Sequence, residues 1–239
     1  MRFGLFACVL VGAAGVAAAA PIPEEKGIIK GFGRWVDPDK DCEWRLENGK
    51  LAVTLPGKDH DLGIERNRMN APRVLREVTG DFKAELRVGG DFEPAEDAAA
   101  LSPTGELERV AFQGAGLLLM ADEKTYIRLE RAALRYKDQG EAGRHRYTSW
   151  ELRDNAEWKL AGTINTFPLE NKDTYLRLER KGNKVKGSVS QDAKEWNELP
   201  ELEVMLPEKV LVGIGVVTTS RKVFRPRFDQ FKVEALKKE

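Results

Sequence analysis

The chain has 239 residues, a length at which one β-sandwich or barrel domain is common. It carries 39 basic and 39 acidic residues, so its formal net charge at pH 7 is zero. That balance argues against a protein that binds nucleic acid through an excess of basic charge.

The first twenty residues predict export. Arg2 supplies a positive charge, and residues 3–20 are apolar and small, ending in four alanines before Pro21. Such a segment is typical of a cleavable secretory signal peptide. A retained membrane anchor is the weaker alternative, because the run is barely long enough to span and no basic cluster follows it. We expect cleavage after Ala20, a single domain over residues 21–239 with no membrane span, and a periplasmic, cell-surface or extracellular location.

Cys42 is the one cysteine left after cleavage, so we expect no internal disulfide in the mature chain. Its sequence neighbours Asp41 and Glu43 are acidic, which disfavours the thiolate, and no His or Lys stands beside it to activate the thiol. We expect Cys42 to be an inert, buried apolar residue.

Most of the chain after Cys42 alternates between apolar and polar residues with the period of a β-strand. Residues 43–47 and 51–55 flank Asn48-Gly49, a pair typical of tight hairpin turns because both residues tolerate positive φ. Turns are also predicted at 154–157 and 181–184. Further strands are predicted at 82–88, 116–120, 126–131, 150–153, 175–180, 185–190, 210–218 and 228–233.

Helical signals are almost missing from the sequence. Residues 73–78 have a weak one, enough for a single turn before Gly80, and residues 89–112 and 137–147 are expected to be long loops. About ten short strands without βαβ alternation predict an all-β sandwich or barrel.

A seven-residue segment occurs twice. Residues 125–131 read Thr-Tyr-Ile-Arg-Leu-Glu-Arg, and residues 174–180 read Thr-Tyr-Leu-Arg-Leu-Glu-Arg. Side chains alternate between the faces of a strand, so the Leu and Ile side chains are expected to face the core, and Tyr, Arg and Glu to face outward. If both copies lie in one sheet, they and their neighbours form one candidate ligand-binding face: Tyr126, Arg128, Glu130, Tyr175, Arg177, Glu179, Glu151 and Arg153.

Two interpretations of this face stay open. In the first, it is a solvated sheet face whose cross-strand ion pairs each contribute about a few tenths of a kcal/mol. In the second, it is a groove that binds a sugar, with tyrosine rings as platforms, arginine as a planar donor and glutamate as an acceptor.

Several segments resemble one bacterial family. They are Asn-Ala-Pro-Arg-Val-Leu at 70–75, Gly-Ala-Gly-Leu-Leu-Leu at 114–119 with the strand 126–130, and Ser-Gln-Asp through Trp at 190–196. Together they are similar to the "regulation of enolase protein 1" family of the concanavalin A-like lectin/glucanase superfamily, from about Trp35 to Val233. The resemblance implies an all-β, concanavalin A-like jelly-roll sandwich of two antiparallel sheets with a concave face. It implies no catalytic residues, and Ala193 stands where the family often has Gly, so the form of that turn stays open.

Catalytic signals are few. Glucanases of that superfamily carry a strand of the type Glu-x-Asp-x-Glu, which this sequence lacks. Glu130 and Glu179 would meet only on neighbouring strands, where arginines would keep both ionised. The sequence has two histidines, His60 and His145, but no Gly-x-Ser-x-Gly motif that would supply a serine nucleophile. Two distant histidines and one cysteine do not suggest the three or four ligands of a zinc site. We therefore expect no catalysis.

Asp37, Asp39 and Asp41 place three carboxylates at alternate positions of a turn, and hard cations prefer oxygen ligands. This makes them a candidate structural calcium site, although Asp-Pro-Asp is also a common turn sequence and the glycine and glutamate of an EF-hand are missing. No other cofactor is expected.

The sequence thus favours an exported carbohydrate-binding protein whose partner is an oligo- or polysaccharide and not a nucleic acid. Two alternatives remain: a glycan-acting hydrolase with an unrecognised carboxylate pair, and a non-catalytic envelope protein whose polar sheet packs against a partner protein.

Overall fold

A computed structural model describes residues 27–96, 100–101, 107–108, 110–136, 139–165 and 172–237 of the chain. The predicted signal peptide lies outside these residues. Within them, no helix is long and apolar enough to cross a membrane.

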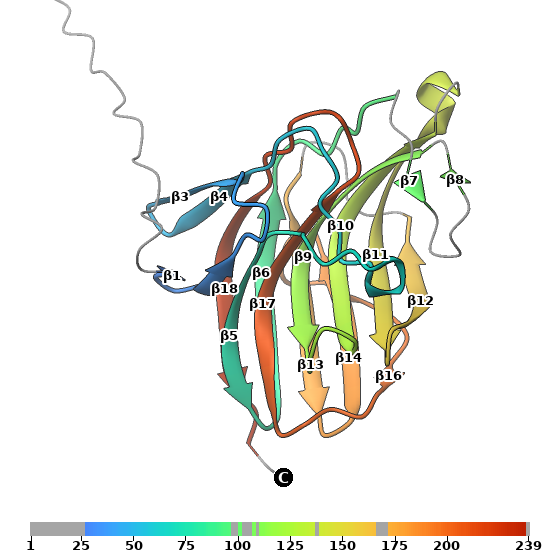
Figure 1. Ribbon diagram of the computed structural model, residues 1–239. Coiled ribbons are helices and arrows are strands. Elements are labelled where there is room, and N and C mark those ends of the chain that lie inside the picture. The colour runs from blue at the N-terminus through green and yellow to red at the C-terminus, as the bar shows by residue number, and fades with distance from the viewer. Residues whose placement is uncertain are drawn as a thin grey trace, which may run out of the picture.

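Two antiparallel sheets pack face to face (Figure 1). The first sheet has the order β1 (Ile28–Ile29), β2 (Gly33–Val36), β5 (Arg73–Thr79), β17 (Lys209–Thr218), β9 (Val110–Met120), β10 (Tyr126–Tyr136), β11 (Arg144–Asp154), β12 (Glu157–Ile164). The second has the order β15 (Asn197–Glu198), β14 (Lys184–Ser190), β13 (Thr174–Lys181), β6 (Phe82–Gly89), β18 (Arg227–Ala235), β4 (Lys50–Thr54), β3 (Glu43–Glu47). β16 (Leu202–Glu203) also pairs with β14, and β7 (Ala100–Leu101) pairs with β8 (Leu107–Glu108). The all-β fold of two antiparallel sheets is confirmed.

The core lies between the two sheets and follows from the alternation of each strand. Ile127 and Leu129 of the first sheet, and Leu176 and Leu178 of the second, are fully buried there, as predicted for both copies of the repeated segment. Fully burying a side chain of this size contributes about 1.5–3 kcal/mol. Trp150 also lies in this core, and its indole nitrogen donates to the carbonyl of Pro200 at 2.9 Å.

The predicted hairpin turns are confirmed. Asn48 and Gly49 both have positive φ, 50° and 76°, and they join β3 to β4. Asn155 and Ala156 repeat this pattern between β11 and β12, with φ of 51° and 70°. Two successive residues of positive φ give a turn whose twist matches that of the strands it joins.

Two expectations about elements are wrong. Residues 73–78 are not helical but form β5, because they pair with β2 on one side and β17 on the other, and those partners are distant in sequence. Much of the expected loop 137–147 is also ordered, since β11 already begins at Arg144 and pairs with β10. The short 3-10 helix η3 (Gly140–Gly143) comes directly before it.

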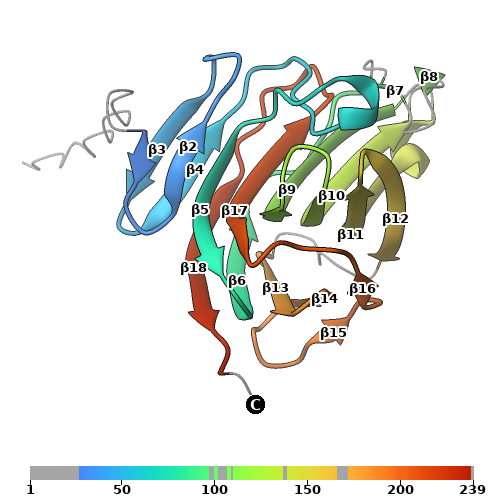
Figure 2. The same ribbon diagram turned by 60° about the horizontal axis from the view of Figure 1, so that its bottom comes forward.

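The segment between β4 and β5 crosses the outer face of the first sheet, the face away from the core, and contains the 3-10 helix η2 (Ile64–Arg66) (Figure 2). We call residues 59–70 the crossing loop. Leu62 anchors it in a small apolar cluster with Leu118, Met120 and Tyr126 of the sheet beneath. The crossing loop therefore covers part of a face that would otherwise be exposed to solvent.

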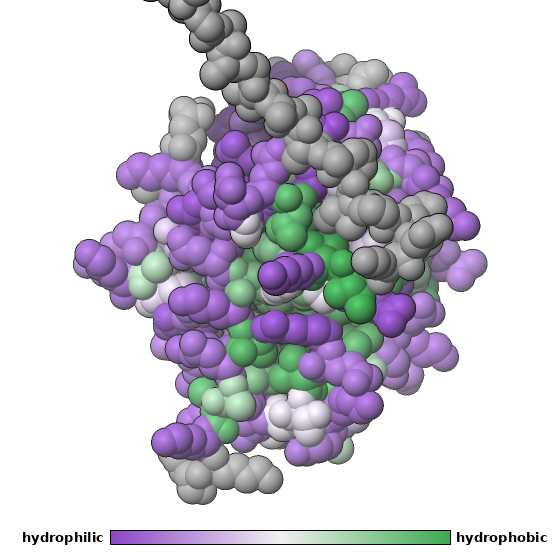
Figure 3. Space-filling view, turned by 90° about the vertical axis from the view of Figure 1, so that its left-hand side faces the viewer, coloured by the Kyte–Doolittle hydropathy of each residue, from purple (hydrophilic) through white to green (hydrophobic). Residues whose placement is uncertain are grey.

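One edge of the sandwich, near β1, β5 and β18, is partly apolar. Phe32 and Phe231 stack there at 5.8 Å, and the guanidinium of Arg76 lies 4.8 Å from the ring of Phe231. Figure 3 shows this side, where apolar side chains reach the surface between charged ones.

Candidate functional site

The two copies of the repeated segment lie in different sheets, so the single shared face expected from the sequence is wrong. The first copy is in β10 of the first sheet and the second is in β13 of the second sheet. After β10 the chain adds β11 and β12 to the same sheet, and only then crosses to pair β13 with β6. The two outward rows therefore face away from each other on opposite sides of the sandwich.

The second copy lies on a half-exposed, ion-paired face. Arg177 donates to Glu85 at 2.7 Å, and its guanidinium lies 3.7 Å above the ring of Trp196. Tyr175 and Glu179 are half-buried beside it, and Glu179 lies opposite Lys186 of β14. This side matches the solvated, ion-paired interpretation.

The first copy is buried. Its Arg128 and Glu130 lie next to Glu151 and Arg153 of the neighbouring strand β11. We call these four residues the charge cluster, and each is 9% exposed or less. Nη2 of Arg128 lies 2.7 Å from Oε1 of Glu130 and 3.2 Å from Oε2 of Glu151, so this guanidinium holds both carboxylates. Arg153 donates to Glu151 from the other side. The cross-strand register explains the contact, since Arg128 of β10 lies directly opposite Glu151 of β11.

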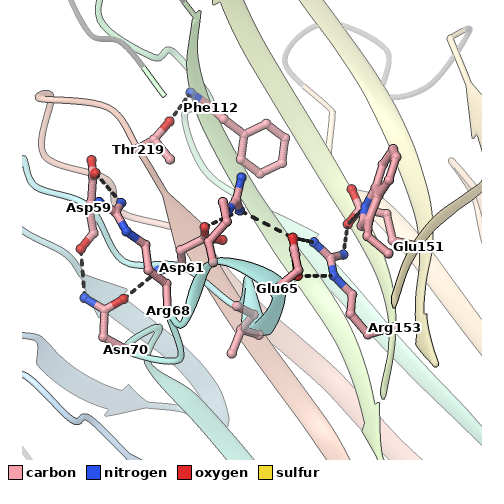
Figure 4. Close-up of polar contacts among 12 residues, drawn as sticks. Asp59, Asp61, Glu65, Arg68, Asn70, Phe112, Glu151, Arg153 and Thr219 are labelled. Atoms are coloured by element: carbon pink, nitrogen blue, oxygen red, sulfur yellow. Dashed lines mark hydrogen bonds and ion pairs between the residues drawn. The ribbon is translucent and has the colours of Figure 1, made fainter. Parts of the chain in front are cut away.

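The crossing loop closes one side of the charge cluster. The hydroxyl of Tyr126 donates to the carbonyl of Leu62 at 2.8 Å, and Arg153 donates to Glu65 at 3.1 Å. Figure 4 shows Glu65 of the loop facing Arg153, which in turn faces Glu151. Tyr126 is fully buried. Its role is therefore to anchor the loop, and it cannot act as the sugar platform that we expected.

Three half-buried aromatic residues surround the charge cluster on the same face, and we call them the aromatic rim: Phe112 of β9, Tyr147 of β11 and Trp158 of β12. The indole nitrogen of Trp158 donates to Glu151 at 3.4 Å. A Cβ atom on Gly114 would lie 2.8 Å from the Glu130 carboxyl and 2.9 Å from the Phe112 ring, which places these two groups side by side over that glycine.

Sequence reasoning missed the aromatic rim. Phe112 and Tyr147 stand at the ends of segments expected to be loops, and Trp158 follows a predicted turn without an assigned strand. The signal that would have found Tyr147 is its alternation with Ser149, Glu151 and Arg153 on the outer face of β11.

The two carboxylates of the charge cluster have opposite pKa shifts. Burial raises the pKa of Glu130 from 4.5 to about 7, and the negative charge of Glu151 adds to this, while Arg128 opposes it. Burial would also raise the pKa of Glu151, but Arg128 and Arg153 outweigh it and lower the value to about 2. The sequence led us to expect that Glu130 and Glu179 meet on neighbouring strands and that arginines keep both ionised. That is wrong, because Glu179 lies in the other sheet and burial opposes the ionisation of Glu130.

The three aspartates of the candidate calcium site all have protein partners. Asp37 accepts from the backbone N–H of Lys40 and Cys42, and Asp39 accepts from Asn70 at 2.9 Å. Asp41 pairs with Lys58 and contacts His60 at 2.9 Å. Calcium binding by Asp37, Asp39 and Asp41 stays a prediction.

Cys42 has a histidine neighbour that its sequence did not reveal. Nε2 of His60 lies 4.0 Å from Sγ of Cys42, and potential ligand atoms of Asp41, Cys42 and His60 lie within 4.8 Å of one another. The expectation that no histidine approaches the cysteine is therefore wrong. Burial, with the charges of Asp37 and Asp41, still raises the pKa of the Cys42 thiol strongly, so the thiolate is disfavoured as expected.

Solved structures share this fold at low sequence identity. A functionally unknown protein from Saccharomyces cerevisiae matches with a TM-score of 0.65 and 20% identity over 87% of this chain and 98% of its own. The GH43 protein BlXynB from Bacillus licheniformis matches with a TM-score of 0.56 and 16% identity over 82% of this chain. This chain spans 37% of the length of BlXynB. At these identities the likeness concerns the fold alone.

Among curated proteins, none matches the chain significantly. A family model does match, over residues 41–236, which include both sheets from β3 to β18 and the whole candidate site. The chain therefore belongs to the family described as "Protein of unknown function (DUF1349)".

Proposed function

We propose that the protein binds a glycan, without catalysis, on the outer face of the first sheet. The observation that carries this proposal is the aromatic rim around the charge cluster. Phe112, Tyr147 and Trp158 come from three strands of one sheet and remain half-exposed, whereas the charged groups between them are buried and held by one another.

The chemistry of this face suits a sugar ring. Aromatic rings supply large, rigid apolar contact area, and Tyr and Trp add a polar group at the edge. Glu151 accepts hydrogen bonds from Ser149, Arg153 and Trp158, so its carboxylate is held in one orientation. Binding then costs little ordering of the protein, because the polar groups are already in place.

Export is part of the proposal and rests on Arg2 and the apolar residues 3–20. An exported protein meets glycans of the cell envelope and the surroundings. The resemblance to the "regulation of enolase protein 1" family stays a prediction, and we propose no enolase-related role, because enolase is a cytoplasmic enzyme.

The test is a binding titration of the protein, expressed from its full sequence, against soluble glucans, xylans, mannans, fructans and pectins. We expect saturable binding to one class, with a loss of at least about tenfold in affinity for Trp158→Ala and Phe112→Ala. Trp196→Ala is the matched control, because Trp196 lies over the outward face of the second sheet. No binding by the folded protein, or equal loss in the control, overturns the proposal.

Hydrolysis of a glycan is the second candidate, favoured by one observation. Both carboxylates of the charge cluster contact the same guanidinium nitrogen, so their oxygens lie at most about 6 Å apart, and their pKa values are shifted in opposite directions. That is the pattern of an acid and a nucleophile in glycosidases that retain configuration.

Glu130→Gln and Glu151→Gln separate the two candidates. Hydrolysis requires turnover of the bound polysaccharide by the native protein and its loss in both variants. Binding without release of reducing sugar from the native protein leaves the non-catalytic proposal and overturns hydrolysis.

A further inference from the structure

A cavity of about 140 Å³ lies at one end of the sandwich. The first sheet contributes Arg131 of β10 and Arg146 of β11. The second sheet contributes the segment after β6, residues 90–93, together with Lys172 and Asp173 before β13 and Arg227 at the start of β18. The cavity therefore lies where the apolar core between the sheets ends, and both sheets line it.

Arg131 is the unusual group in this cavity. It occupies the inward-facing row of β10 that continues from Ile127 and Leu129, and it is 5% exposed. Its Nη1 donates to the carbonyl of Lys172 at 2.8 Å, and its guanidinium lies 4.7 Å from the ring of Phe92. Its Nε has no hydrogen-bond partner in the described part of the chain, and no carboxylate there forms an ion pair with it. A buried cation that lacks an anion is costly unless a ligand supplies one.

The other charges around the cavity leave it positive. Lys172 and Arg227 are exposed at its mouth, and neither has an ion pair with the described residues. Three acidic residues face the four basic ones of the lining: Asp91 is exposed, Glu93 is paired with Lys222 at 2.9 Å, and Asp173 approaches Arg87 at 3.5 Å. Burial, together with the charges of Arg146 and Arg227, lowers the pKa of Arg131 to about 10, although Asp173 and Asp91 oppose this shift.

We propose that this cavity binds a sugar acid, with the ligand carboxylate on Arg131 and Arg227. Guanidinium groups hold carboxylates through parallel hydrogen bonds, and the guanidinium of Arg131 lines the cavity while donating to one carbonyl of the described residues, so it has a further N–H for such a ligand. A cavity of about 150 Å³ holds a molecule the size of benzene, so the cavity found here would take the carboxyl end of the sugar ring, with the remaining hydroxyls at its mouth. The carboxylates of Asp91 and Glu93 at the wall are acceptors for ring hydroxyls. This site does not depend on the aromatic rim, which lies on the outer face of the first sheet.

The test is calorimetric titration of the protein with glucuronate and galacturonate, with glucose and galactose as neutral counterparts and sulfate as a competing oxyanion. We expect saturable binding of a uronate, no response to the neutral sugars, and at least about tenfold weaker binding in Arg131→Gln and Arg227→Gln. Arg225→Gln is the matched control, because Arg225 is exposed two residues away and does not line the cavity.

Arg227 is exposed, so Arg227→Gln tests the site even if Arg131→Gln does not fold. Absence of uronate binding by the folded protein, or equal affinity in Arg227→Gln, overturns the proposal. Sulfate binding without uronate binding also overturns it, since the cavity would then accept a bare oxyanion and not a sugar acid. Trp158→Ala should bind the uronate normally whether or not the aromatic rim binds polysaccharide, so the two sites fail independently.

Discussion

Glu130 shows what burial does to one carboxylate. Its side chain lies over Gly114, next to Phe112 and Arg128, and it is 3% exposed. Arg128 is shared with Glu151, which Arg153 also neutralises. The two glutamates therefore respond to burial in opposite ways, and Glu130 is the one whose ionisation the fold opposes.

Glu130→Gln should remove a pH dependence of stability. Because the folded-state pKa of Glu130 is raised from 4.5 to about 7, its stabilising contribution is complete below pH 4.5 and is lost as pH rises through 7. From pH 5 to 8 the native protein should lose on the order of 2 kcal/mol of unfolding free energy relative to the variant. Urea unfolding across this range measures it.

Glu179→Gln is the control, since Glu179 holds the same position in the second copy of the repeat and is half-exposed. Equal pH profiles of the native protein and Glu130→Gln would contradict the shift. Glu151 has the opposite sign: its pKa is lowered to about 2, so its contribution is present above pH 4.5 and is lost as the pH falls toward 2.

At the scale of elements, the turns hold residues in conformations that their sequence disfavours. Between β14 and β15, the hydroxyl of Ser190 accepts from the N–H of Ala193, and Asp192 accepts from Lys194 and Glu195. These contacts hold Ala193 at a φ of 62°. Ala193 thus has the left-handed backbone conformation that glycine adopts most easily.

Ala193→Gly should stabilise the protein by about 1 kcal/mol, because an L-residue pays a steric cost in the left-handed region that glycine does not. Thermal unfolding measures the change. Ala52→Gly in β4 is the control and should destabilise, since Ala52 pairs in regular register with both β3 and β18 and glycine there only increases the conformational freedom of the unfolded chain. A decrease for both substitutions would contradict the strain at Ala193.

Much of this level was predictable from sequence, and the reasons are specific. The pair Asn48-Gly49 predicts a tight hairpin turn by itself, because both residues tolerate positive φ. The alternation of apolar and polar residues is enough to predict that Ile127 and Leu129 face the core. The pairing partner of a strand is not local information, so the sequence did not separate β10 from β13 into two sheets. The alternation of a strand predicts that Arg128 and Arg177 both face outward. It does not predict that the crossing loop buries Arg128 while Arg177 stays half-exposed. The site was therefore predicted by residue type and misplaced in space.

At the scale of the whole molecule, the second sheet is completed only by the end of the chain. β18 lies between β6 and β4, so it joins strands that begin more than a hundred residues earlier. The first sheet is completed in the same way, because β17 joins β5 to β9. Pairing between distant segments pays loop-closure entropy before contacts form, which slows folding.

Removing residues 227–239 should abolish cooperative unfolding. The truncation leaves β6 and β4 without their shared partner and removes the buried Phe228 from the core. Circular dichroism with increasing urea checks this. A truncation of residues 236–239 alone ends beyond β18 and should retain a cooperative transition. A cooperative transition in the longer truncation would show that β18 is dispensable.

The seven-residue repeat has a consequence for how this chain tolerates change. One copy lies under the crossing loop and the other faces water, although both present the same Tyr, Arg and Glu from equivalent strand positions. In the copy at 174–180 the half-buried outward residues Tyr175, Arg177 and Glu179 can change singly, whereas Arg180 is buried and donates to the carbonyls of Gly182 and Pro207. The copy at 125–131 is locked to Leu62, Glu151 and, through Arg153, Glu65, so its residues must vary in concert. Among relatives of this protein, the first copy should drift as a block and the second residue by residue.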